Sequence, residues 1–108
     1  MTKAEYLQRG ESLDYTNATE DTIPDGAVVT IGSRIGVTGC PIPPGKTGIL
    51  HVVGVFEIAK SGTAAVEMGQ TLYFDGTGVT DTAGDVVAGY AAAPADAAAE
   101  TVLVQLNG

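Results

Sequence analysis

The chain has 108 residues, with thirteen acidic and five basic side chains and a net charge of −8. This length corresponds to one domain, and so few cations disfavour nucleic acid as the main partner, because phosphates need Lys and Arg. No apolar run is long enough to cross a membrane, the single Cys40 cannot form an internal disulfide, and no secretory leader is visible. We therefore expect an acidic, soluble protein that is made in a cytoplasm, with no nucleic acid and no membrane as partner.

Composition favours β structure. Fifteen Gly, thirteen Thr and many Val accompany only two Phe, four Tyr and no Trp. Val and Thr favour strands, whereas Gly and Pro interrupt them. A core built from small aliphatic side chains suits a narrow barrel or sandwich better than a helical bundle.

Short strands are predicted along most of the chain, after an extended arm over residues 1–12 with the apolar residues Tyr6 and Leu7. Alternation and turn residues such as Pro24 and Gly26 set the strand boundaries. We expect strands over residues 12–15, 27–31, 34–38, 49–59, 71–74, 79–80, 86–91 and 101–106.

Three connections break this pattern. Residues 39–48 hold three Pro and three Gly and cannot form a regular element. Residues 64–69 are expected to form one helical turn. Eight Ala crowd into residues 88–99, but Pro94 interrupts the helical tendency, so we expect a loop with at most one helical turn there.

The predicted fold is therefore all-β: a small barrel or sandwich of about eight short strands, with at most one or two helical turns. We expect two parts, an N-terminal arm over residues 1–12 and a single β-barrel domain over residues 13–108. A weak internal repeat suggests two related hairpins. Residues 26–31 resemble residues 69–74, and residues 35–38 resemble residues 88–91.

The expected core draws on the most strand-like segments. If the strand over residues 49–59 is regular, only one of Val55 and Phe56 can face inward, because neighbouring side chains alternate. The core candidates are Val53, Val55, Phe56, Ile58, Leu72, Phe74, Val102 and Val104.

Gly45-Lys46-Thr47 resembles the end of a phosphate-binding loop, but the match is incomplete. A P-loop needs a Gly where this chain has Cys40, and the neighbouring prolines remove backbone donors that a phosphate cradle requires. No long helix is expected after Thr47 to bind the anion at its N-terminus. We interpret residues 39–48 as a structured loop.

Other motifs do not form a catalytic or metal site. His51 and Cys40 are too few ligands for a metal and have no supporting third group as a nucleophile pair. The acids Asp75, Asp81 and Asp85 lie in Gly- and Thr-rich turns without the spacing of a calcium loop. We therefore expect a protein that is not an enzyme and has no cofactor.

An ordered series of short motifs resembles the phage capsid cement, or head decoration, family over nearly the whole chain. The motifs are Gly-x-x-Leu-Asp-Tyr-Thr (10–16), Asp-Gly-Ala-Val-Val (25–29), Ile-Gly-Val-Thr (35–38), Gly-Val-Phe-Glu-Ile-Ala-Lys (54–60), Gly-Gln-Thr-Leu-Tyr-Phe-Asp (69–75), Gly-Tyr-Ala (89–91) and Val-x-Val-x-Leu-Asn-Gly (102–108).

The resemblance implies a structural virion protein that binds the outer surface of a phage head and stabilises the capsid lattice. Its partners would be the major capsid protein and itself, as a homotrimer or alternatively a dimer. The alternatives are a small nucleotide-binding or enzymatic module that uses Gly45-Lys46-Thr47, and a free ligand-binding β-domain. The expected capsid or subunit contacts are Lys3, Tyr6, Leu7, Arg9, Ile42, Pro43 and Lys46.

Overall fold

A computed structural model describes residues 2–107, so Met1 of the expected arm and Gly108 of the expected domain lie outside the described residues. The strands are β1 (Ser12–Thr16), β2 (Val28–Ile31), β3 (Arg34–Thr38), β4 (Thr47–His51), β5 (Val55–Ala59), β6 (Thr71–Phe74), β7 (Val79–Thr80), β8 (Val87–Ala91) and β9 (Thr101–Leu106). The predicted all-β class is confirmed, with nine strands in one mixed sheet that does not close into a barrel over these residues. Nothing in residues 2–107 forms a helix that could span a membrane.

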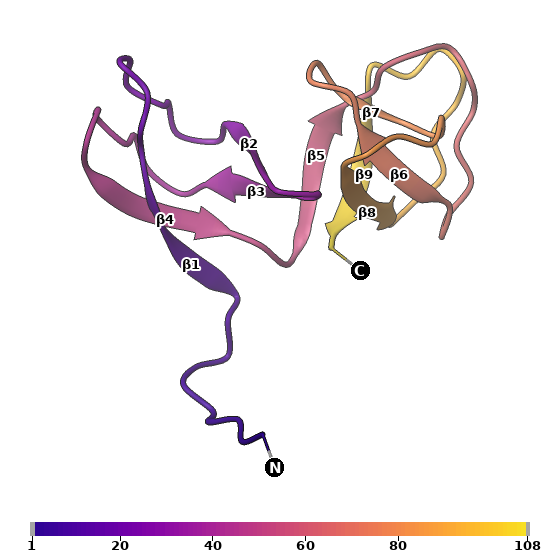
Figure 1. The fold of residues 1–108 in the computed structure, drawn as a ribbon. Coiled ribbons are helices and arrows are strands. Elements are labelled where there is room, and N and C mark those ends of the chain that lie inside the picture. The colour runs from indigo at the N-terminus through magenta and orange to yellow at the C-terminus, as the bar shows by residue number, and fades with distance from the viewer. Residues whose placement is uncertain (1, 108) are drawn as a thin grey trace.

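The sheet is divided into two lobes, which lie side by side in Figure 1. Strands β1 to β4 form the N lobe, and β5 to β9 form the C lobe. The lobes meet where β3 runs parallel to β8, with the amide of Val87 donating to the carbonyl of Ser33 at 2.9 Å. The side-chain amide of Asn107 also donates to the carbonyls of Ile35 and Val52, at 3.0 and 2.6 Å. Asn107 thus ties the end of the C lobe to the N lobe and to the linker.

The two lobes repeat one pattern of strand pairing. The order is β1-β4-β3-β2 in the N lobe and β5-β9-β8-β6 in the C lobe. Reciprocal backbone hydrogen bonds join Ile23 to Ile42 in the first lobe, and Val66 to Ala95 in the second. The internal repeat in the sequence therefore corresponds to a structural duplication, although the copies lie in two lobes and not in one barrel.

The segment predicted as one strand over residues 49–59 is two strands in different lobes. β4 begins at Thr47, inside the stretch expected to be irregular, and ends at His51. Gly54, with a φ of 115°, turns the chain before β5 begins at Val55. Because the chain changes direction here, the simple alternation expected across the whole segment does not hold.

The core contains half of the predicted candidates. Ile58, Leu72, Val102 and Val104 are buried, while Phe56 and Phe74 are partly buried and pack against them. Val53 and Val55 were predicted in the core but are 42% and 53% exposed. Val55 is the outward neighbour of Phe56, as alternation within β5 requires.

Neither residues 64–69 nor the Ala-rich stretch after β8 is helical. Residues 64–69 do not form the expected helical turn; instead Val66 bridges to Ala95 in antiparallel fashion. The expected loop over the Ala-rich stretch is confirmed. Pro94 precedes the bridge, and the backbone of Ala95 donates to and accepts from Val66. Tertiary pairing with a second loop overrides the intrinsic helix propensity of Ala.

Glycine is required at the centre of β3 and β8, because another strand passes closely at both places. A Cβ at Gly36 would lie 2.5 Å from the Leu50 side chain, and one at Gly89 would lie 1.9 Å from the carbonyl oxygen of Gln105. Gly89 also has a φ of 146°, which L side chains rarely adopt.

Gly89→Ala is therefore expected to destabilise the protein strongly, by about 3 kcal/mol or more, since backbone atoms cannot move aside as a flexible side chain can. Thermal unfolding measures the effect. Gly84→Ala is the matched control, because nothing lies within 4 Å of a Cβ at Gly84. Equal melting temperatures for the two variants would contradict the close packing of β8 against β9.

Candidate interaction surfaces

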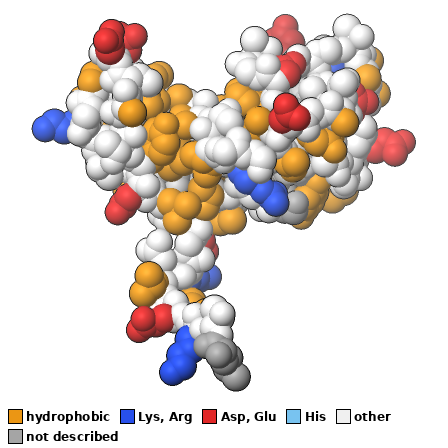
Figure 2. Space-filling view, viewed as in Figure 1, with side chains coloured by type: hydrophobic (Ala, Val, Ile, Leu, Met, Phe, Trp, Pro, Cys, Tyr) orange, Lys and Arg blue, Asp and Glu red, His pale blue; other side chains and the backbone are white. Residues whose placement is uncertain are grey.

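The N-terminal arm projects from the body with its apolar side chains exposed (Figures 1 and 2). Residues 2–10 belong to no strand or helix. Tyr6 and Leu7 are 79% and 85% exposed. Arg9 lies 3.4 Å from Glu11 in an exposed ion pair, a kind of contact that contributes little to stability. The arm is therefore an extended segment whose large apolar side chains are exposed in the isolated chain.

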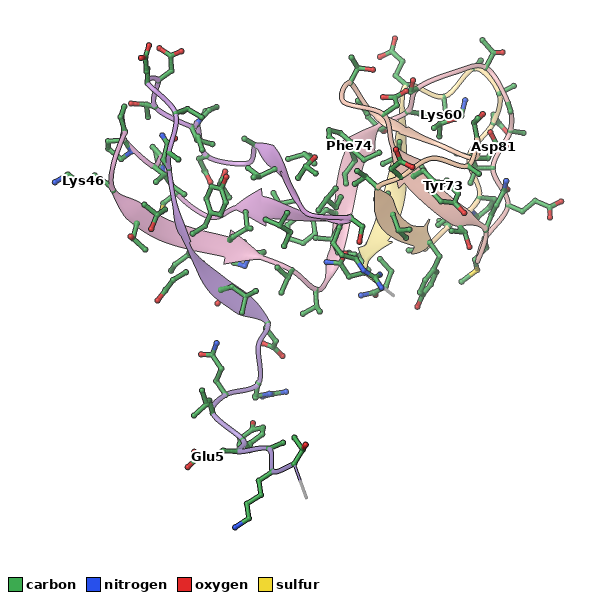
Figure 3. The ribbon with its side chains drawn as sticks, in the orientation of Figure 1. Glu5, Lys46, Lys60, Tyr73, Phe74 and Asp81 are labelled. Atoms are coloured by element: carbon green, nitrogen blue, oxygen red, sulfur yellow. The ribbon has the colours of Figure 1, made fainter. Side chains whose placement is uncertain are left out.

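The other predicted contacts lie at a different place. Pro43 and Lys46 are exposed on the loop before β4, and Figure 3 shows Lys46 at the far end of the N lobe, away from Glu5 of the arm. Ile42 is completely buried, so its side chain is part of the lobe interior and not of the exposed surface. The structure thus brings Lys3, Tyr6, Leu7 and Arg9 together on the arm but separates them from the loop.

Asn17 fixes this loop, a role that the sequence reasoning did not assign. The residue is buried, and its side-chain amide donates to the carbonyls of Asp21 and Ile42, at 2.7 and 2.8 Å. Its Oδ1 accepts from the backbone amide and the hydroxyl of Thr19. An Asn followed two residues later by Thr is a signal for such a side-chain turn.

The Gly45-Lys46-Thr47 segment uses its polar groups within the fold. The Gly45 amide donates to the carbonyl of Asn17 at 2.8 Å, and the Lys46 amide to that of Pro43 at 3.0 Å. The Thr47 hydroxyl is hydrogen-bonded to that of Thr16. These donors are directed at protein acceptors, whereas a phosphate loop directs successive amides at its ligand.

Asp75 organises the turn between β6 and β7. Its Oδ1 accepts from the amides of Thr77 and Gly78, at 3.0 and 2.9 Å, and its Oδ2 accepts from the Ser61 hydroxyl. These hydrogen bonds, that from Ser61 above all, hold the pKa of Asp75 well below its ordinary value. Among the described residues, no group of three or more His, Cys, Asp or Glu is placed to hold a metal ion.

Exposed apolar side chains also lie on the outer face of the C lobe. The strand register places Val55 beside Gln105, and Gln105 beside Tyr90. Leu103, two residues before Gln105, shares this face because side chains alternate. Val55, Tyr90 and Leu103 are each between 39% and 53% exposed.

A cleft of about 680 Å³ opens between the lobes. Val28 and His51 line it from the N lobe, and Phe56 and Phe74 from the C lobe. The rings of His51 and Phe56 are 6.0 Å apart. Figure 2 shows hydrophobic side chains gathered where the lobes meet, and in Figure 3 Phe74 lies on the side of the C lobe that faces the N lobe. The cleft combines residues far apart in the sequence, so linear patterns did not reveal it.

Comparison with known proteins identifies the family. A family model described as phage cement protein matches residues 7–106. The match covers nearly the whole chain, and the chain belongs to this family. No curated protein and no solved structure matches it.

The occupied amides of Gly45 and Lys46 predict that the protein does not bind ATP or GTP at physiological concentrations. Calorimetry should detect no binding heat, for the natural chain or for Lys46→Ala. Micromolar affinity that disappears in Lys46→Ala would contradict the structural interpretation of this loop.

Asp75→Ala is expected to lower the melting temperature at neutral pH. A carboxylate whose pKa is depressed in the folded state stabilises that state above its ordinary pKa of 3.8, and this contribution is lost as the pH falls below that value. The difference in melting temperature between natural chain and variant should therefore be largest near pH 7 and shrink below pH 3.8. Asp81→Ala, in a neighbouring exposed position, is the control. If the difference in melting temperature between the natural chain and Asp75→Ala grew as the pH falls, the stabilising role of the Asp75 carboxylate would be contradicted.

Proposed function

We propose that this phage cement protein binds the outer surface of an assembled head and stabilises the capsid lattice, without catalytic activity. Its partners are the major capsid protein and other copies of itself, most simply in a homotrimer, with a dimer as the alternative. The family match supports a structural role in the phage capsid. The projecting arm is the observation that carries the finer proposal.

The energetics of the arm support attachment through it. Ordering an extended segment costs about 1–2 kcal/mol per residue, and residues 2–9 have little contact with their own body to offset this cost. Burial of Tyr6 and Leu7 against a neighbouring subunit would contribute roughly 1.5–3 kcal/mol each. Lys3 and Arg9 would set the register through pairing with acidic groups. We therefore place residues 1–12 in the role of anchor and residues 13–108 in that of the decorating body.

The distribution of charge supports the outer surface. The segment over residues 1–11 carries equal numbers of cations and acids, so the remaining chain holds the whole net charge of −8. An acidic body is repelled by packaged nucleic acid. A neutral arm on an acidic body can approach the shell without bringing the negative charge into the contact.

Several copies of a weak arm contact can together attach an oligomer tightly. In a closed oligomer each copy presents the same surface, so several arms engage one lattice site together. After the first arm has bound, the others bind at a high effective concentration, and the total affinity far exceeds that of one arm.

Deletion of residues 2–9 is expected to leave a folded protein that no longer decorates heads, because these residues lie outside the lobes. Sedimentation with purified undecorated heads measures binding, and the temperature at which heads release their nucleic acid measures stabilisation. Tyr6→Ala with Leu7→Ala should weaken decoration in the same direction. Met68→Ala is the matched control, since Met68 is 71% exposed on the C lobe and not on the arm.

Undiminished decoration by the deleted protein would show that the arm is not the anchor. Decoration without any rise in the temperature of head disruption would contradict the stabilising role while leaving the attachment intact.

A further inference from the structure

The cleft between the lobes continues into a groove along β2. A second hollow of about 620 Å³ is lined by Thr30 on β2 and by Asp85 and Val86 before β8. It shares Phe74 and Gly76 with the first cleft. The combined space, here called the interlobe groove, is lined by Asp25 and Gly26 before β2 and by Val28 and Thr30 within it. Its shape suits an extended peptide better than a compact small molecule.

The edge of β2 beside this groove is free of strand pairing within the described chain. β2 pairs with β3 alone. An unpaired edge presents backbone N–H and C=O groups that can take up another strand.

The C lobe, which repeats the strand pairing of the N lobe, has an added strand at the edge that corresponds to the free edge of β2. There β6, the counterpart of β2, pairs with β7 on its other side. β7 belongs to the connection over residues 75–86, whereas β2 and β3 are joined only by Gly32 and Ser33. Lys60 bridges to Val79, so β7 also reaches the end of β5 and nearly closes the C lobe. The N lobe contains no such strand of its own between residues 2 and 107.

The chemistry of the groove selects an apolar segment flanked by cations. Phe56 and Phe74 supply apolar walls, and no Lys or Arg lines the two hollows. Asp25, Asp75 and Asp85 are among the lining residues. The side chain of Glu57 shares the outer face with Val55, because side chains alternate along β5. Asp75 already accepts several hydrogen bonds, so Asp25 and Asp85 remain to pair with incoming cations.

The arm has the matching chemistry. It is extended, and the exposed pair Tyr6 and Leu7 lies between Lys3 and Arg9. The other three basic residues of the chain lie far apart from one another, at positions 34, 46 and 60. The arm is therefore the one segment of seven residues that combines two cations with two exposed large apolar side chains. In Figure 2 the arm projects away from the body of its own chain, on the side opposite the hollow between the lobes.

We propose that the arm of one copy enters the interlobe groove of a second copy and pairs with the free edge of β2. This inference rests on the proposed function, in which copies of this chain act together on the head, and it names a second copy, in place of the capsid protein, as the neighbour that the arm engages. The head-to-tail contact is heterologous, so repetition around a rotation axis closes a ring. Tyr6 and Leu7 contact the aromatic walls of the groove, and Lys3 and Arg9 face its carboxylates.

A synthetic peptide of residues 2–11 tests the groove directly. It should bind the protein from which residues 2–9 have been deleted, as measured by calorimetry. Asp25→Lys with Asp85→Lys in the deleted protein should weaken this binding about tenfold or more through charge repulsion. Asp96→Lys with Glu100→Lys is the matched control, since these exposed acids lie outside the groove. Equal weakening by both double variants, or no binding at all, would overturn the inference.

Cross-linking in the full-length protein tests the same contact between whole copies. In a Cys40→Ser background, a chain with Tyr6→Cys should form a disulfide with a separate chain carrying Val28→Cys. A chain carrying Thr63→Cys, an exposed loop position outside both hollows, should not form that bond. Melting curves of each variant confirm that it is folded.

The two proposals fail in different ways. If deletion of the arm abolishes decoration while the peptide and the cross-link give no signal, the arm binds the capsid protein and the groove inference is wrong. If the peptide binds the groove and the cross-link forms but deletion leaves decoration intact, copies exchange arms and the anchor to the head lies elsewhere.

Discussion

Backbone pairing between loops is the interaction on which the rest of this structure depends. The antiparallel bridge between Ile23 and Ile42, and its repeat between Val66 and Ala95, joins segments that are not strands. Each bridge holds two turns together, so that the following strands return beside the preceding ones. Loops rich in Pro and Ala have few side-chain donors, and their backbone groups must find partners within the fold. The bridges satisfy these groups and set the path of both lobes.

The composition of the core follows from the strand arrangement that these bridges set. Because the strands are short and cross closely, the interior has room for Val, Ile, Leu and Ala but not for large aromatic side chains. Gly36 and Gly89 occupy equivalent places in the two lobes, and each permits a neighbouring strand to approach. Other glycines, such as Gly26 and Gly69, have a positive φ with open space around a Cβ, so they are needed for turns and not for close packing.

Asymmetry between the duplicated lobes is the source of the candidate interaction surfaces. The longer connection between β6 and β8 provides β7 and covers one edge of the C lobe. The two-residue turn between β2 and β3 leaves the corresponding edge of the N lobe without a partner strand. An edge that is free in an isolated chain is a liability unless an intended partner covers it.

The sequence was informative where local chemistry determines structure. Turn residues and alternation located most strand positions, and the repeated central glycine indicated the duplication. It misled at residues 49–59, where apolar residues on both sides of Gly54 belong to different lobes. A pattern of hydrophobic residues does not show a change of direction, so exposed Val53 and Val55 were assigned to the core.

The surfaces between elements were harder to predict, for a different reason. The interlobe groove gathers Val28, Phe56 and Phe74 through long-range contacts that depend on the sheet order. Ile42 illustrates the same limit: it is in a Pro-rich loop, yet the bridge to Ile23 draws it into the interior. The exposed state of residues 2–10 follows more directly from the sequence, because a short segment of mixed charge cannot form its own core.

An exposed arm and an acidic, aromatic-poor body give the two parts of the chain different surfaces. An arm with tight contacts to its own body would lose the free energy available for attachment, since only the difference between bound and free states contributes to affinity. The small lobes are stabilised by backbone pairing and tight packing, so Tyr6 and Leu7 are not needed in the core. Both side chains instead lie exposed on the arm, outside the lobes. In the proposed function, stability of the fold and affinity for neighbours therefore belong to separate parts of the chain.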